Sequence, residues 1–143
     1  MLRYVPCLLL CVVLHWASTG CAPKLLGPTT PSGYFYTLSV TDSRLWFNAM
    51  RLAGNLPHNT EVIVRVQNAA GQPVDGVPVE FQVAPSWVDS VSIIPEIALT
   101  KDGIARTRVQ PLTSGALRLT TRVEDIAQES IIVVQSYSPP QSR

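Results

Sequence analysis

The sequence is short of charged residues and of cysteine, and both shortages limit what the protein can be. Only 15% of its 143 residues are charged, whereas about a quarter are charged in an average globular protein. None of the three cysteines follows position 21, so residues 22–143 hold neither a disulfide framework nor a cysteine-based zinc site. Low charge together with many Val, Thr and Pro residues favours an all-β exported domain over a helical cytosolic one.

Residue types suited to catalysis are equally scarce. His58 is the only histidine after position 21, and it stands in the loop Leu56–Asn59. A histidine base needs a nucleophile and an orienting partner, and the sequence suggests neither. The aspartates stand singly in turns rather than in a calcium-binding loop. We therefore predict a protein that is not an enzyme and that holds neither a metal nor a cofactor.

The N-terminal residues 1–20 have the anatomy of a secretory signal peptide. Arg3 supplies a positive charge, Val5–Trp16 is apolar, and the small residues Ala17–Gly20 come before Cys21. Twelve helical residues extend about 18 Å, whereas the hydrocarbon core of a bilayer is roughly 30 Å thick. The segment is therefore too short for a transmembrane anchor, and a cleaved signal is the better interpretation.

The last residues of this segment, Ser18-Thr19-Gly20-Cys21, resemble the lipobox of bacterial lipoprotein signal peptides, with Ser18 where Leu is usual. The resemblance implies cleavage before Cys21, lipidation of Cys21 and attachment to the membrane through that lipid. Stable anchoring needs at least two acyl chains, and a triacylated cysteine exceeds that number. Ala22, in place of Asp, implies sorting to the outer membrane of a two-membrane cell envelope. The alternative is an ordinary signal peptide that leaves Cys21 free or disulfide-linked.

The charges of the remaining chain balance. The 11 basic residues become 10 when Arg3 is removed, and they equal the 10 acidic residues. Nucleic-acid binding needs a basic excess, and so does a general attraction to anionic lipid. We therefore predict no nucleic-acid partner. Another envelope protein is the expected partner, and a small-molecule ligand is not expected.

Composition divides the chain into segments. Residues 21–33 are rich in Pro and Gly, which predicts a semi-extended tether of roughly 40 Å at full extension. Residues 34–135 show the strand-and-turn pattern of one β-sandwich, and residues 136–143 are expected to be a disordered tail.

Alternating apolar residues predict the strands of the sandwich. In the segment 61–67 the inward residues are Val62, Val64 and Val66, and in 77–83 they are Val77, Val79, Phe81 and Val83. Further strands are expected at 34–40, 86–94, 97–100, 104–109, 117–123 and 130–135. Asp102-Gly103 predicts a hairpin between Leu99 and Ile104. The segment 45–53 could be an irregular strand or a short helix that ends at Gly54, and its neighbours favour the strand.

The order of these elements resembles bacterial immunoglobulin-like domains of the intimin/invasin type over residues 36–135. The resemblance rests on the strand EVIVRVQ, the turn NAAGQPVDGV, the strand PVEFQV and the later run KDGIARTRV. Carboxypeptidase regulatory-like domains share part of the first turn, and the DG-x-A run favours the immunoglobulin-like alternative. The resemblance implies a Greek-key β-sandwich of about seven strands, a spacer or adhesive role and no catalytic residues. Asn68 departs from the acidic residue that is common there, and the chain has one copy where the family usually repeats.

Two groups of side chains are candidate binding residues. Trp46 and Trp87 could stack on sugar rings, although packing in the core or at a sheet edge is the favoured alternative. Five outward arginines could form a basic patch, although cross-strand pairing with Glu61 and Glu80 on a solvated face explains them as well. They are Arg65, Arg106, Arg108, Arg118 and Arg122.

The leading functional hypothesis is a non-enzymatic cell-envelope lipoprotein with a single immunoglobulin-like domain in a structural or protein-binding role. The alternative is a soluble periplasmic or secreted module that binds a carbohydrate or a peptide.

Overall fold

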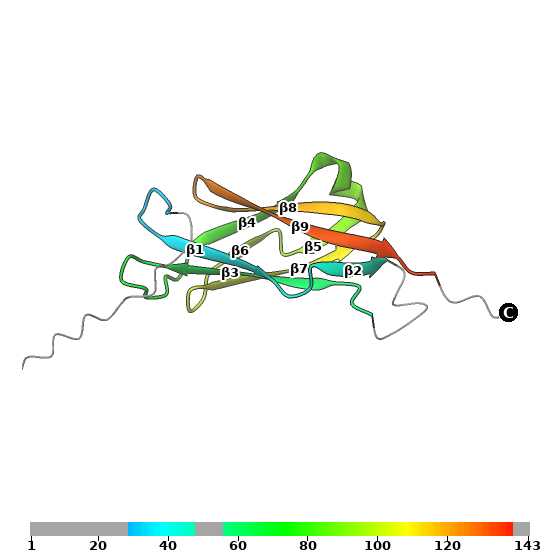
Figure 1. Ribbon diagram of the computed structural model, residues 1–143. Coiled ribbons are helices and arrows are strands. Elements are labelled where there is room, and N and C mark those ends of the chain that lie inside the picture. Colours follow the sequence, from blue (N-terminus) through cyan, green and yellow to red (C-terminus); the bar gives the residue numbers. More distant parts are fainter. Residues whose placement is uncertain (1–28, 48–55, 139–143) are drawn as a thin grey trace, which may run out of the picture.

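The alternating apolar segments of the sequence form two stacked β-sheets (Figure 1). The structure is a computed structural model, and it describes residues 29–47 and 56–138. The strands are β1 (Phe35–Val40), β2 (Arg44–Phe47), β3 (Thr60–Gln67), β4 (Pro78–Val83), β5 (Val91–Ile94), β6 (Ile97–Leu99), β7 (Ile104–Pro111), β8 (Gly115–Val123) and β9 (Ile126–Ser136). One 3-10 helix, η1 (Pro85–Ser90), precedes β5.

The four-stranded sheet has the order β1-β3-β7-β5, and all its pairs are antiparallel. The five-stranded sheet has the order β2-β9-β8-β4-β6, in which only β2 and β9 run parallel. The predicted all-β immunoglobulin-like sandwich is thus confirmed. The described residues form nine strands rather than about seven, and the chain changes sheets at Pro95, between β5 and β6.

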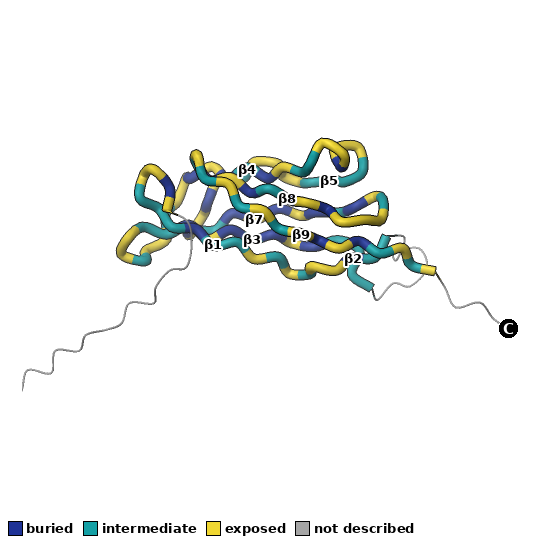
Figure 2. Tube along the Cα trace, turned by 45° about the horizontal axis from the view of Figure 1, so that its top comes forward, coloured by how far each residue is buried: buried dark blue, intermediate teal, exposed yellow. Residues whose placement is uncertain are grey.

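The hydrophobic core lies between the two sheets (Figure 2). Each strand sends alternate residues inward, and full burial of a Val or Phe side chain contributes about 1.5–3 kcal/mol. The predicted inward residues of β3 and β4 are buried, except that Val83 is half-buried at the end of its strand. Tyr36 also lies in the core, where its hydroxyl donates to the carbonyl oxygen of Ile126 at 3.3 Å and so links the two sheets.

At one end of the sandwich the turns 68–76 and 100–103 interlock, and we call these turns the closed end. The carboxamide oxygen of Asn68 accepts from the backbone N–H groups of Ala70 and Gln72, each at 3.0 Å, as Asn does in tight turns. The Thr100 hydroxyl accepts from the Val77 N–H at 3.0 Å and donates to the Val74 carbonyl at 2.7 Å. Side chains therefore pair the polar backbone that these turns would otherwise leave unsatisfied.

The Asp102-Gly103 turn belongs to the closed end. Both residues have positive φ angles, 52° and 70°, which a tight two-residue turn of this kind requires. The predicted turn is therefore present, and Lys101 and Ile104 exchange two backbone hydrogen bonds across it, at 2.9 and 3.0 Å. The strand pairing does not continue beyond this bridge, because β6 and β7 belong to different sheets. The turn also docks on β3: Val66 N–H donates to the Gly103 carbonyl at 2.8 Å.

Three other segments differ from the sequence prediction or extend it. The strand favoured for 45–53 is present as β2 up to Phe47, and 48–55 lie outside the described residues. The expected strand 86–94 begins instead as η1, which has Pro at its start. Strand β9 begins at Ile126 rather than at 130. The chain reverses in a two-residue turn, residues 124–125, in which Glu124 has a φ of 51°.

The described chain starts and finishes at opposite ends of the sandwich (Figure 1). Thr29 bridges to the start of β1, and the Ser32 N–H donates to the Glu124 carboxylate at 3.1 Å, so residues 29–33 lie at the closed end. Tyr137 N–H donates to the Phe47 carbonyl at the other end. Nowhere in residues 29–47 and 56–138 is there a helix with the length and apolar character needed to cross a bilayer.

Candidate interaction surface

The histidine that the sequence singled out lies beside an amide rather than a nucleophile. His58 Nε2 is 3.1 Å from the side-chain nitrogen of Asn59. Within the described part of the chain, no three His, Cys, Asp or Glu side chains come together as a metal site would require.

The two tryptophans have different surroundings. Trp87 on η1 is only 8% exposed, and its indole N–H donates to the Ala116 carbonyl at 3.1 Å. Its ring lies against Gly115, where an added Cβ would come within 3.0 Å. Trp87 therefore cannot face a ligand, and the favoured packing alternative describes it. Trp46 is half-buried on β2 and meets Tyr137 edge to face, with ring centres 6.5 Å apart. The lipidation candidate, Cys21, lies outside the described residues.

Two titratable groups are perturbed by the fold. Burial raises the pKa of Tyr36, because the charged phenolate is poorly solvated between the sheets. The pKa of Glu124 is lowered, first by the hydrogen bond from the Ser32 side chain and then by the Ser32 backbone N–H. Both residues stabilise structure at or near the closed end, and neither lines a depression in the surface.

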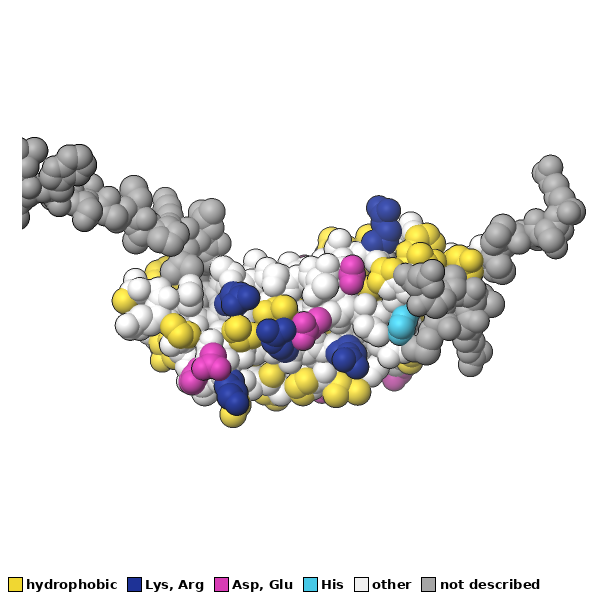
Figure 3. Space-filling view, turned by 90° about the horizontal axis from the view of Figure 1, so that it is seen from below, with side chains coloured by type: hydrophobic (Ala, Val, Ile, Leu, Met, Phe, Trp, Pro, Cys, Tyr) yellow, Lys and Arg dark blue, Asp and Glu magenta, His cyan; other side chains and the backbone are white. Residues whose placement is uncertain are grey.

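Most basic side chains of the described residues lie on the strands, whereas most acidic side chains lie in the turns and loops that connect the strands. The outward positions of β3 and β7, in the four-stranded sheet, carry Arg65, Arg106 and Arg108 and one acid, Glu61. Figure 3 shows basic and acidic side chains interspersed on this face. The expected cross-strand pairing holds in part. Arg106 pairs with Glu61 at 3.1 Å, whereas the described residues show no ion pair for Arg108.

On the other sheet, Arg118 meets Glu129 at 3.7 Å with both side chains more than half exposed. The pairing of Glu80 with an arginine that the sequence suggested is not formed as an ion pair within the described residues. Glu80 stands opposite Arg122 in the register of β4 and β8, but no ion pair joins them within the described residues. Exposed pairs of this kind contribute little to stability.

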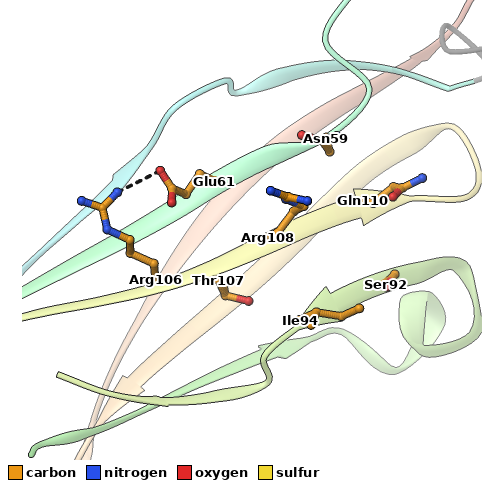
Figure 4. Close-up of a pocket in the computed structure, with 8 residues that line it drawn as sticks. All are labelled: Asn59, Glu61, Ser92, Ile94, Arg106, Thr107, Arg108 and Gln110. Atoms are coloured by element: carbon orange, nitrogen blue, oxygen red, sulfur yellow. Dashed lines mark hydrogen bonds and ion pairs between the residues drawn. The ribbon is translucent and has the colours of Figure 1, made fainter. Parts of the chain in front are cut away.

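A depression of about 550 Å³ lies on the outward face of the four-stranded sheet, over β3, β7 and β5 (Figure 4). We call it the outer depression. The Arg106–Glu61 pair stands at one side of it. Glu61 is also opposite Arg108 in the register of β3 and β7, but within the described residues no ion pair joins these two. Its lining residues are Asn59, Glu61, Ser92, Ile94, Arg106, Thr107, Arg108 and Gln110.

A second depression, of about 310 Å³, lies on the other side of β5, toward the five-stranded sheet. We call it the side depression. It is mostly apolar, and Val88 at its margin is 60% exposed. Its lining residues are Phe81, Gln82, Val83, Val88, Val91, Ile93 and Glu96.

Strand β5 separates the two depressions and ends the four-stranded sheet. Its side away from β7 has no strand beside it, and we call this side the open edge. Ile94, at the end of β5, is 69% exposed. The sequence alone does not predict this surface. Its signal is an apolar run that stops at Pro95, because proline within sheets is confined to edge strands, strand starts and bulges.

Several solved structures share this fold. The D00-D0 domain structure of intimin matches 68% of this chain and 45% of that chain, with 13% identity and a TM-score of 0.53. Invasin, a bacterial integrin-binding protein, matches 71% of this chain and 19% of that chain, with 18% identity and a TM-score of 0.52. Domains 1–6 of the surface layer protein SbsC match 72% of this chain and 13% of that chain, with 13% identity and a TM-score of 0.51.

These likenesses show the fold alone, because all three sequence identities are below a fifth and are too low to carry a function over. The chain spans less than half the length of each of these structures. No family model matches the sequence, and no curated protein matches it. The domain thus has the immunoglobulin-like fold of bacterial surface proteins, and the matching structures are non-enzymatic adhesin or surface-layer domains.

Proposed function

We propose that this chain is a non-enzymatic cell-envelope lipoprotein that presents a single immunoglobulin-like domain to another envelope protein. The observation that carries the proposal is the run of small residues ending in Gly20-Cys21, placed between an apolar segment and a domain of this fold. A lipid on Cys21 would attach the domain without a transmembrane helix. Ala22 after the cysteine favours the outer membrane.

The direction of the chain through the sandwich supports an anchored, outward-facing domain. Thr29 bridges to Phe35 at the closed end, and Tyr137 bonds to Phe47 at the opposite end, so an anchor before Thr29 would place the closed end toward the bilayer. Because residues 29–33 lie against the domain, the proposed tether would be at most the seven residues 22–28. Seven residues extend at most roughly 25 Å, and the domain would therefore stay near the membrane surface.

The fold favours a protein partner over catalysis. Invasin, which shares the fold, is described as an integrin-binding protein, and SbsC is described as a surface layer protein. For this chain the corresponding role is structural support or protein binding in the envelope.

Lipid labelling tests the anchor directly. Cells that express the full chain are grown with a clickable palmitate analogue, and the protein is separated into membrane and soluble fractions. The native chain should carry label and sediment with membranes. Cys21→Ala should lose both properties, whereas Cys11→Ala, inside the segment that is removed, should keep both. A Cys21→Ala variant that stays fully membrane-bound contradicts the proposal.

The soluble alternative predicts the opposite fractionation: an unlabelled native protein that Cys21→Ala leaves unchanged. The burial of Trp87 weighs against a soluble module that binds a carbohydrate, because Trp46 alone of the two candidate tryptophans remains accessible to a sugar ring.

A further inference from the structure

We infer that the open edge of β5 binds an extended peptide segment of a protein partner in which acidic residues alternate with apolar ones. The inference rests on the proposed role as a protein-binding module, and it specifies the chemistry of the contact. The peptide adds a strand to the four-stranded sheet. Its acidic side chains point toward the outer depression, and its apolar side chains point toward the side depression.

The backbone of β5 supplies the first argument. Leu112 N–H donates to the Ser90 carbonyl at 2.8 Å, and antiparallel strands exchange such bonds at every second residue. Along the register of β5 with β7, the residues that bond to β7 are therefore Ser92 and Ile94. Val91 and Ile93 direct their N–H and C=O groups to the open edge. Two donors and two acceptors are thus available to an added strand.

The side depression supplies the second argument. Side chains of an added strand alternate between the two faces of the sheet, and those opposite Val91 and Ile93 point to the same side as these two residues. There they meet the half-buried Val83, Val91 and Ile93 and the exposed Val88. Burial of this apolar area away from water is favourable at about 25 cal/mol per Å², so the peptide should be apolar at these positions.

The outer depression supplies the third argument. Peptide side chains opposite Ser92 and Ile94 point to the face that carries Arg108, which stands across from Ile94 in the register. An added strand lies about 9.6 Å from β7, two strand spacings away, and the long side chains of Glu and Arg together can bridge that distance over Ile94. Glu61 pairs with Arg106, so the charge of the outer depression that has no ion-pair partner is the positive charge of Arg108. Carboxylates suit it best.

The same charge argument excludes other occupants of the edge. The segments outside the described residues, 1–28, 48–55 and 139–143, contain no Asp or Glu, so none of them can supply an acidic side chain. A second copy that paired β5 with β5 would present Ser92 and Ile94 on the outer face of its own β5, and neither residue can supply a carboxylate to Arg108. An acidic sugar would lack an aromatic platform, because no aromatic residue lines the outer depression.

The test measures binding of synthetic peptides to the purified full chain. An eight-residue fluorescent peptide in which Glu alternates with Val is titrated, and binding is followed by anisotropy up to about 1 mM. A peptide in which Lys replaces Glu has the same β propensity and the opposite charge. The Glu–Val peptide should bind at least about tenfold more tightly than the Lys–Val peptide. Equal binding, or no binding of the Glu–Val peptide, overturns the inference.

Two charge reversals on the same sheet locate the contact. Arg108→Glu lies in the outer depression, and Arg65→Glu lies outside it on β3. Both arginines are exposed, so both variants should fold, as circular dichroism and thermal unfolding will show. Arg108→Glu should weaken the Glu–Val peptide by about tenfold or more and Arg65→Glu by less than about threefold. Equal losses in the two variants point to general charge attraction and overturn the site.

Amide hydrogen exchange separates strand addition from side-chain docking. In the free protein the amides of Val91 and Ile93 should exchange rapidly, and saturating Glu–Val peptide should slow both by at least about tenfold. Peptide binding that leaves these two rates unchanged contradicts strand addition.

Other occupants give different results. Tighter binding of an oligogalacturonate than of the Glu–Val peptide, or a dimer in sedimentation that β5 variants abolish, overturns the assignment to a peptide. These measurements do not depend on Cys21. Failure of lipid labelling with peptide binding intact therefore removes the membrane anchor alone, and the converse result removes the peptide site alone.

Discussion

The closed end and the open edge of the sandwich differ in whether their backbone N–H and C=O groups have hydrogen-bond partners within the domain. At the closed end, side chains of Asn68, Thr100 and Asp75 take up backbone N–H groups of the turns. At the open edge, the N–H and C=O groups of Val91 and Ile93 have no strand beside them, and Ile94 is 69% exposed. The contrast shows where this chain uses its side chains for its own fold and where it leaves backbone and apolar surface for another molecule.

The contrast also explains why the motif residues of the turn are scaffold. Gly103 sits where an added Cβ would lie 2.6 Å from the Pro73 Cβ and 2.8 Å from the Val66 carbonyl oxygen. The turn around Pro73 therefore needs glycine across from it. Gly103 itself is buried in this arrangement, whereas the open edge makes no such demand on its residue types.

The largest effect on stability should come from Gly103→Ala at the closed end. The change adds a clash with backbone and with a rigid proline, at a φ of +70° that alanine disfavours. We expect a loss of about 3 kcal/mol in the free energy of unfolding, measured by urea denaturation. Gly71→Ala is the matched control: its φ is +77°, but no heavy atom lies within 4 Å, so about 1 kcal/mol is expected. Equal losses would show that the turns do not interlock.

Removal of the Thr100 hydroxyl should have the next largest effect. Thr100→Val leaves the buried Val77 N–H and the Val74 carbonyl without their partner. We expect a loss of about 2 kcal/mol in unfolding free energy. The control is Thr120→Val on β8, half-exposed and outside the closed end, with a change within about 0.5 kcal/mol. A neutral Thr100→Val would contradict the role given to this hydroxyl.

At the open edge, a substitution should change the free energy of unfolding very little. Ile94→Thr replaces an exposed β-branched residue by another of similar shape, so the unfolding free energy should change by less than about 0.5 kcal/mol. Affinity for the Glu–Val peptide should nevertheless fall, because Ile94 lies between the added strand and Arg108. If Ile94→Thr destabilises the fold as much as Thr100→Val, the edge is part of the structural core and the comparison fails.

The smallest effect concerns pH at the closed end. The lowered pKa of Glu124 means that its carboxylate is stabilised in the folded state. This contribution is complete above the ordinary pKa of 4.5 and is lost as pH falls through the lower folded value. Wild type should therefore melt slightly above Glu124→Gln at pH 7, and the two should converge at pH 3. A difference in melting temperature that grows on acidification would contradict the hydrogen bond with Ser32.

Much of the fold could be predicted from the sequence, because alternation of Val and polar residues in β3 and β4 sets which face is buried. The tight turn at Asp102-Gly103 could be predicted for the same local reason. Its connection could not, since local sequence does not say whether β6 and β7 share a sheet. The open edge escaped prediction because strand order depends on distant pairings, and the unpaired state of Arg108 depends on Arg106 taking Glu61.

Site-specific photo-crosslinking in the envelope of the native cell tests the contrast most directly. A photoreactive amino acid is placed at Ile94 on the open edge or at the exposed Ala69 of the closed end, and crosslinked peptides are identified by mass spectrometry. Ile94 should crosslink to an acidic, extended segment of a second protein, and Ala69 should give no such product. Crosslinks from Ala69 with none from Ile94 would contradict the account.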